Sequence, residues 1–169
     1  WPVVVAVIAF QLKDRLAELL PRIRKLKHKD TELEFAEGVS KLVKEQQAEG
    51  ITHPSSNRSS ESQQKFNFLM QLAEISPRSA VLEAFREIEN ASALAISRLS
   101  GENTEKSHFN SPLKMQRLLS ELTLSKSEAK MYHQLRHLRN KAAHDKEFNL
   151  HGMPIEAYID LSLSLANRL

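Results

Sequence analysis

Apolar residues recur three or four positions apart through the second half of the chain, which is the spacing of one helical face. The pattern covers residues 66–75, 76–101, 111–122, 125–144 and 153–169. Ser-Pro pairs open the second and third segments, and Ser125 with Glu128 has capping-box spacing at the start of the fourth. No convincing strand pattern occurs there. The predicted fold is all-α, a bundle of four to five helices with short connections.

The first ten residues, WPVVVAVIAF, carry no charge. A membrane-spanning helix needs about 20 apolar residues, so we interpret residues 1–10 as the end of a truncated membrane span. The alternative is a short buried strand, because the run is rich in β-branched residues. The next twenty residues hold seven basic side chains, Lys13, Arg15, Arg22, Arg24, Lys25, Lys27 and Lys29. This excess beside an apolar segment follows the positive-inside rule and predicts a cytoplasmic location for the rest.

Residues 11–50 are expected to form a juxtamembrane basic amphipathic region. Within it, TELEF at 31–35 alternates like a short extended piece, and 36–50 resembles a weakly apolar helix. Residues 51–64 are rich in serine and amide side chains and have almost nothing to bury, which predicts a flexible linker. This division leaves residues 65–169 as the helical bundle domain.

The composition limits the kinds of functional site that we expect. The net charge is +3 and cysteine is absent, so neither a strongly basic chain nor a disulfide framework or thiolate nucleophile is indicated. His133 and His137 lie one turn apart, but no third metal ligand is evident. Glycine-rich phosphate loops and nucleophile elbows are missing from the sequence. We expect no metal and no cofactor.

The segment HQLRHLRNKAAH, residues 133–144, has an apolar and a polar face. Leu135, Leu138 and Ala142 share one side of a helical wheel. The opposite side carries His133, Arg136, His137, Asn140 and His144. Arg139 lies at the edge of the apolar side, where a guanidinium removed from water needs a carboxylate. The candidates are Glu83, Glu87 and Glu89, and Glu87 is favoured because it flanks the apolar face of its helix.

Two segments, SPRSAVLEAFREIE (76–89) and LRNKAAH (138–144), resemble the HEPN superfamily (higher eukaryotes and prokaryotes nucleotide-binding), particularly bacterial members with an N-terminal membrane segment. Arg139 and His144 have the Arg-x4-His spacing of that family. The resemblance covers most of the chain apart from the serine-rich linker. It implies an all-α HEPN-like helical bundle that forms a homodimer, with the motif helices facing each other across the two-fold axis.

Active members of the superfamily are metal-independent ribonucleases. By resemblance, the catalytic residues would be Arg139, Asn140 and His144. His144 would serve as general acid or base and Arg139 would hold the scissile phosphate, while Asn140 would orient one of them or the phosphate. The resemblance also suggests RNA or phosphate contacts at Arg136, His137 and Lys141, with Glu87 as the supporting ion-pair partner.

A second interpretation stays open because Arg139 and His144 are five residues apart, about 140° around an ideal helix. They do not share a face, so a common site needs the long arginine side chain, a frayed helix end, or residues from two chains. The alternative is a non-catalytic helical dimerisation or interaction module in which Arg139 is a structural ion-pair residue. Chance occurrence of the motif is a third possibility.

The expected location is the cytoplasmic face of the inner membrane. Residues 1–29 would contact the membrane surface, where the basic run 22–29 meets anionic headgroups, and RNA is the other partner that this run could bind. A role in defence or stress response follows from the resemblance alone.

Overall fold

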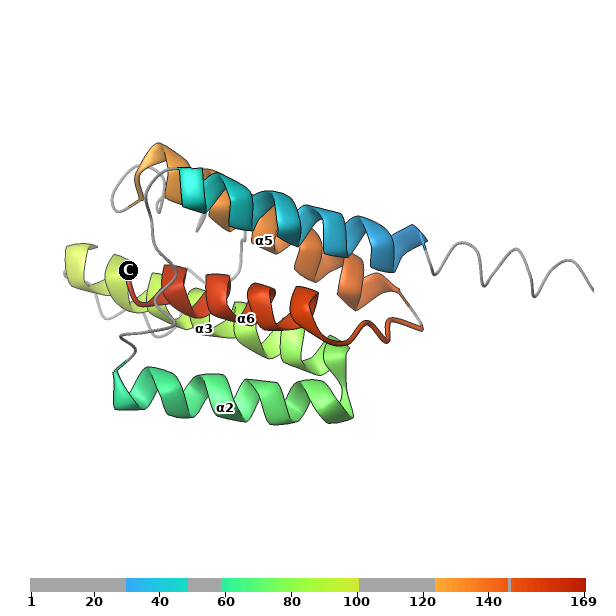
Figure 1. Ribbon diagram of the computed structural model, residues 1–169. Coiled ribbons are helices and arrows are strands. Elements are labelled where there is room, and N and C mark those ends of the chain that lie inside the picture. The colour runs from blue at the N-terminus through green and yellow to red at the C-terminus, as the bar shows by residue number, and fades with distance from the viewer. Residues whose placement is uncertain (1–29, 49–58, 101–123, 146) are drawn as a thin grey trace, which may run out of the picture.

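The computed structural model describes residues 30–48, 59–100, 124–145 and 147–169 (Figure 1). They form a helix at residues 30–48, α2 (Ser60–Ile75), α3 (Pro77–Ser100), α5 (Lys126–His144) and α6 (Met153–Ala166). Strands are absent from these described ranges. The predicted all-α bundle is therefore confirmed.

The pair α3 and α6 forms the centre of the bundle. α2 packs against both of them, and α5 contacts both as well (Figure 1). The face of α3 that the sequence pattern predicted is buried, with Val81, Ala84, Phe85 and Ile88 each at most 1% exposed. Burying one such large side chain contributes about 1.5–3 kcal/mol, so this face is a main source of the stability of the bundle.

The helix at residues 30–48 belongs to the same core. Phe35, Val39 and Leu42 are each at most 1% exposed. The Phe35 ring lies 5.2 Å from that of Phe148 and 5.4 Å from that of Tyr158 between centroids. Residues 31–35 are therefore not an extended piece, and their alternating pattern was misleading because Phe35 and Val39 continue at helical spacing.

This helix runs antiparallel to α5 (Figure 1). Ion pairs mark both ends of the contact, Glu34 with Lys141 at one end and Glu45 with Lys130, 2.9 Å apart, at the other. Between them, a Cβ built on Gly38 would lie 2.7 Å from Leu138 Cδ2. The missing side chain of this glycine lets the two helices approach closely.

The predicted linker at 51–64 is wrong in its last part. Residues from Ser60 onward belong to α2, and Ser59 caps this helix by accepting a 3.2 Å hydrogen bond from the Ser62 amide. Serine is a preferred N-cap residue, so the composition of a linker and that of a helix start overlap here. The predicted division into a juxtamembrane region and a separate bundle also fails, because residues 30–48 are part of the bundle.

Several expectations lie outside the described residues. They concern the membrane span at 1–10, the basic segment up to residue 29, the linker at 51–58 and the helix at 111–122. None of the described helices is both long and apolar enough to span a bilayer.

Candidate functional site

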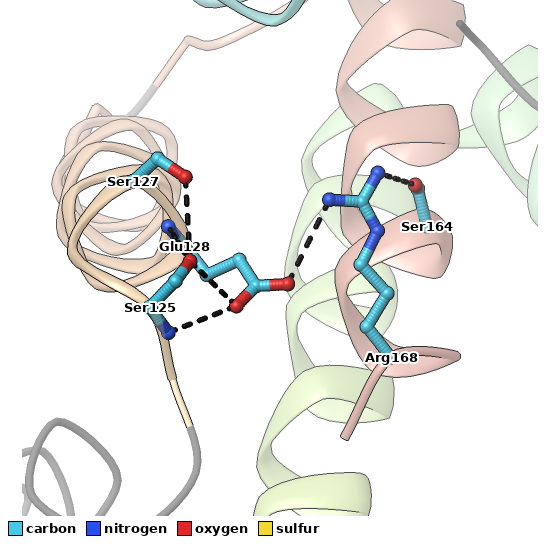
Figure 2. A network of polar contacts seen from close by, with 5 residues as sticks. All are labelled: Ser125, Ser127, Glu128, Ser164 and Arg168. Carbon is cyan, nitrogen blue, oxygen red and sulfur yellow. Dashed lines mark hydrogen bonds and ion pairs between the residues drawn. The ribbon is translucent and has the colours of Figure 1, made fainter. Parts of the chain in front are cut away.

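The start of α5 is fixed by the capping box that the sequence predicted (Figure 2). The Ser125 hydroxyl accepts from the Glu128 amide at 3.3 Å, and Glu128 Oε2 accepts from the Ser125 amide at 2.9 Å. Arg168, just beyond α6, places a guanidinium nitrogen 3.8 Å from the other Glu128 oxygen. Burial alone raises the pKa of Glu128, but the bonds from Ser125 and the charge of Arg168 outweigh it and lower that pKa.

The apolar side of α5 faces the core as predicted. Leu135, Leu138 and Ala142 are at most 3% exposed. Tyr158 of α6 donates a 3.1 Å hydrogen bond to the Leu135 carbonyl. The turn at residues 139–144, which carries the Arg-x4-His motif, therefore lies on a helix whose rotation is fixed by its contacts with α3 and α6.

Arg139 turns toward α3 and packs against it. One guanidinium nitrogen donates to Asn140 Oδ1 at 3.0 Å, and the other lies 3.9 Å from Glu89 Oε1. Its Cζ sits 5.6 Å from the centre of the Phe85 ring. The Nε atom is buried without a hydrogen-bond partner among the described residues, and 34% of the side chain is exposed. The guanidinium thus lies against an aromatic core residue and beside one carboxylate.

Glu87 is not the partner of Arg139, so this predicted ion pair is wrong. Glu87 instead lies 2.9 Å from Lys65 of α2, and its hydrogen bond raises the pKa of Lys65. Two residues along a helix correspond to a rotation of about 200°. Glu87 therefore faces α2, while Glu89 faces α5. The sequence could not decide which glutamate pairs with Arg139, because it does not show which side of α3 packs against α5.

His144 is the last residue of α5 and is exposed. No hydrogen bond or ion pair joins it to Arg139 among the residues that the structure describes. The next residue, Asp145, is only 8% exposed, and its carbonyl accepts a hydrogen bond from Arg78 at the start of α3. A cation at a helix C-terminus is favoured by the helix dipole, so Arg78 stabilises the end of the motif helix.

The three predicted phosphate contacts differ in their surroundings. Lys141 is bound to Glu34, and this hydrogen bond, followed by the charge of Lys141, holds the pKa of Glu34 below its ordinary value. His137 is exposed and Arg136 is half-buried. Lys141 therefore stabilises the contact between α5 and the helix at residues 30–48 through its ion pair with Glu34.

The structure brings Arg139 and Asn140 together but places His144 at the helix end, away from the contacts that Arg139 makes with α3. Sequence reasoning missed Arg78, Glu34 and the close approach at Gly38. A glycine inside an otherwise helical run was the available signal for the last of these. The other two depend on tertiary neighbours that no local pattern reveals.

Groups of three or more histidine, aspartate or glutamate side chains with the geometry to hold a metal ion do not occur within the described part of the chain. The chain matches no protein-family model, no curated protein and no solved structure.

Proposed function

We propose that the chain is a HEPN-like helical module that acts by association, without catalysis, and that Arg139 is one of its structural residues. The observation that carries this proposal is the surroundings of Arg139. Its guanidinium lies beside the Glu89 carboxylate and against the Phe85 ring within its own protomer. Those contacts hold the guanidinium against α3 through an ion pair and a packing contact within the fold.

Electrostatics support the same proposal. A phosphate that approached Arg139 would also approach the Glu89 carboxylate, 3.9 Å from the guanidinium. Like charges at such a distance repel each other. An arginine that lies over an aromatic ring loses a cation–π contact as well as its ion pair when it moves away. Binding RNA at Arg139 would therefore require the side chain to leave a favourable site.

The second candidate is a metal-independent endoribonuclease with a role in defence or stress response. It is favoured by the exposure of His144 and by the Arg139–Asn140 hydrogen bond, which is the orienting contact that the family resemblance implies. In this candidate a second chain supplies the residues that one protomer does not bring together. His137 and Arg136 would then be the remaining RNA contacts.

Incubation of the intact protein with RNA in a chelating buffer separates the two candidates. The interaction module leaves the RNA intact at any protein concentration. Cleavage that is lost in His144→Ala but retained in His151→Ala, a matched change at another exposed histidine, would establish the ribonuclease and contradict the module.

The proposal includes a tether at the cytoplasmic face of the inner membrane through residues 1–29. Its support is the uncharged run at 1–10 and the seven basic residues after it. Co-sedimentation with anionic vesicles measures this directly. Equal binding of the intact chain and of a variant that lacks residues 1–29 would contradict the tether.

A further inference from the structure

Two histidines, His133 and His137, lie one turn apart on the outer face of α5, and both side chains are exposed. Residues four apart on a helix share a face, with their Cβ atoms about 5–6 Å apart. Two histidines at this spacing on one helix are the pair that holds zinc in the HExxH motif. The spacing therefore allows both imidazoles to bind a single metal ion.

The backbone under the two histidines is held by the core. Leu135 and Leu138, on the opposite side of α5, are at most 3% exposed, and the Leu135 carbonyl accepts the hydrogen bond from Tyr158. The His133 ring also lies edge-on to the Tyr132 ring, with 6.2 Å between the centroids. Ligands carried by a helix that is already ordered lose little conformational freedom when they bind an ion.

The lysines that flank the pair are neutralised within the fold. On the side toward the helix at residues 30–48, Lys141 is bound to Glu34 and Lys130 lies 2.9 Å from Glu45. The pKa of Glu34 is lowered mainly by its bond with Lys141, and the charge of His137 adds to this shift. A carboxylate therefore lies within electrostatic reach of His137, which favours a cation at this position.

We propose that His133 and His137 form a surface site for one divalent transition-metal ion that prefers imidazole ligands, such as zinc. The ion takes one nitrogen from each ring, and water fills its other positions. This inference goes beyond the proposed function and does not depend on it. It revises the expectation from the sequence, which required a third protein ligand for a metal site.

Arg136 lowers the affinity that this site reaches. It follows His133 by three residues, about 60° around the helix toward the side of Arg139, and it is half-buried. Its positive charge repels a bound cation. Because the protein also supplies only two of the usual four zinc ligands, the expected dissociation constant is about 1–100 µM.

Two other exposed histidines near the site provide matched controls. His144 follows His137 by seven residues, about 10.5 Å along the helix axis, whereas His133 and His137 are about 6 Å apart along it. His151 lies in the connection before α6, where its Nε2 is 3.1 Å from Asn149 Oδ1. Neither is placed to share an ion with His133.

Zinc titration of the intact, tag-free protein by isothermal calorimetry, after removal of bound metal with a chelator, tests the site. We expect His133→Ala and His137→Ala each to weaken zinc binding by about tenfold or more, because either change leaves a single protein ligand. His144→Ala and His151→Ala should keep the affinity of the unsubstituted protein. Magnesium prefers oxygen ligands and should give no binding heat in the same range.

Several outcomes of this titration would overturn the site. One is an affinity that does not change in His133→Ala and His137→Ala. Another is a loss in only one of these two variants, which would show that the ion is not shared. Binding only at zinc concentrations of about 1 mM or more, far above the expected range, would identify an adventitious ion only.

Thermal unfolding gives a second test. The two histidines are held one turn apart only while α5 is formed, so zinc stabilises the folded chain. At a zinc concentration ten times the dissociation constant, the melting temperature should rise by about 3–6 °C in the unsubstituted protein and less in His137→Ala. Equal rises in the two proteins would contradict the inference. The RNA assay under Proposed function uses a chelating buffer, so its result is independent of this site.

Discussion

Tyr158 joins three parts of the bundle at a single buried side chain. It lies on α6, its ring packs against Phe35 of the helix at residues 30–48, and its hydroxyl donates to the Leu135 carbonyl of α5. It is fully buried, and this burial raises its pKa well above the ordinary value. The hydroxyl therefore stays protonated as a donor throughout the physiological pH range.

The Tyr158→Phe substitution removes that hydroxyl and leaves the ring in place. We expect it to lower the free energy of unfolding by about 1 kcal/mol, the usual contribution of one buried hydrogen bond. Denaturant titration monitored by circular dichroism measures the change. The control is Tyr132→Phe, since no hydrogen bond of the Tyr132 hydroxyl occurs among the described residues, and a change within about 0.5 kcal/mol is expected there. Equal changes in the two variants would contradict the role of the Tyr158 bond.

Arg139 illustrates what one residue's sequence context can predict. Its position beside Leu135 and Ala142 correctly predicted a carboxylate partner on the helix 76–101, and Glu89 was among the three candidates. The choice of Glu87 failed because the rotation of α3 about its axis is set by its contacts with α2 and α6. Periodicity places a residue on a face, but it does not say which neighbour that face meets.

The contact between the helix at residues 30–48 and α5 depends on the absence of a side chain at Gly38. Ala at this position raises intrinsic helix stability by about 1 kcal/mol, but its Cβ would meet buried Leu138. Overpacking of this kind costs about 1–3 kcal/mol. We expect Gly38→Ala to be neutral or destabilising in the natural chain.

The same substitution is expected to stabilise a Leu138→Ala background, where the obstructing side chain is gone. A double-mutant cycle on unfolding free energies measures this coupling, and about 1 kcal/mol or more is expected. Additive effects at the two positions would show that the close approach of the helices has no energetic consequence.

The ion pairs at the two ends of this contact predict how its stability depends on pH. The hydrogen bond from Lys130, above all, holds the pKa of Glu45 below its ordinary value of 4.5. A lowered carboxyl pKa in the folded state contributes stability above the ordinary pKa, and this contribution is lost as the pH falls through the folded pKa. The pair is partly exposed, so the contribution is expected to stay below about 1 kcal/mol.

The melting temperature should therefore fall less in the Glu45→Gln variant than in the unsubstituted protein when the pH is lowered from about 6 to about 3. Lys130→Gln removes the same pair from the other side and should show the same reduced dependence. Thermal melts across this pH range provide the comparison. Parallel curves for the natural protein and both variants would contradict a role for the pair.

Among the helices, the starts of α3 and α5 were predicted from local sequence, whereas the start of α2 was not. The capping box at Ser125 and the Ser-Pro start near residue 76 depend only on residues that are close in sequence. Both are found in the structure. The boundary at 51–64 failed in its last residues because serine-rich sequence favours both linkers and N-caps. Membership of residues 30–48 in the bundle was missed because their few apolar residues acquire a partner only in the tertiary fold.

Within the described residues, the bundle has a helical core and one unusual surface, the turn of α5 at residues 139–144, where Arg139 is held against α3. The sequence predicted the all-α class and the helix that carries Arg139. It did not predict that residues 30–48 complete the same core, because that depends on contacts between distant segments.

Arg139 is proposed as a structural residue of this fold, and the free energy of unfolding of the whole chain measures that role. Arg139→Ala removes the contacts with Asn140, Glu89 and Phe85 and is expected to cost about 1–2 kcal/mol. The matched control is Arg86→Ala on the exposed side of α3, where the side chain is 62% exposed and pairs with Glu83 at 2.6 Å. We predict a change within about 0.5 kcal/mol for this control. A loss for Arg139→Ala no larger than that for Arg86→Ala would show that Arg139 has no structural role.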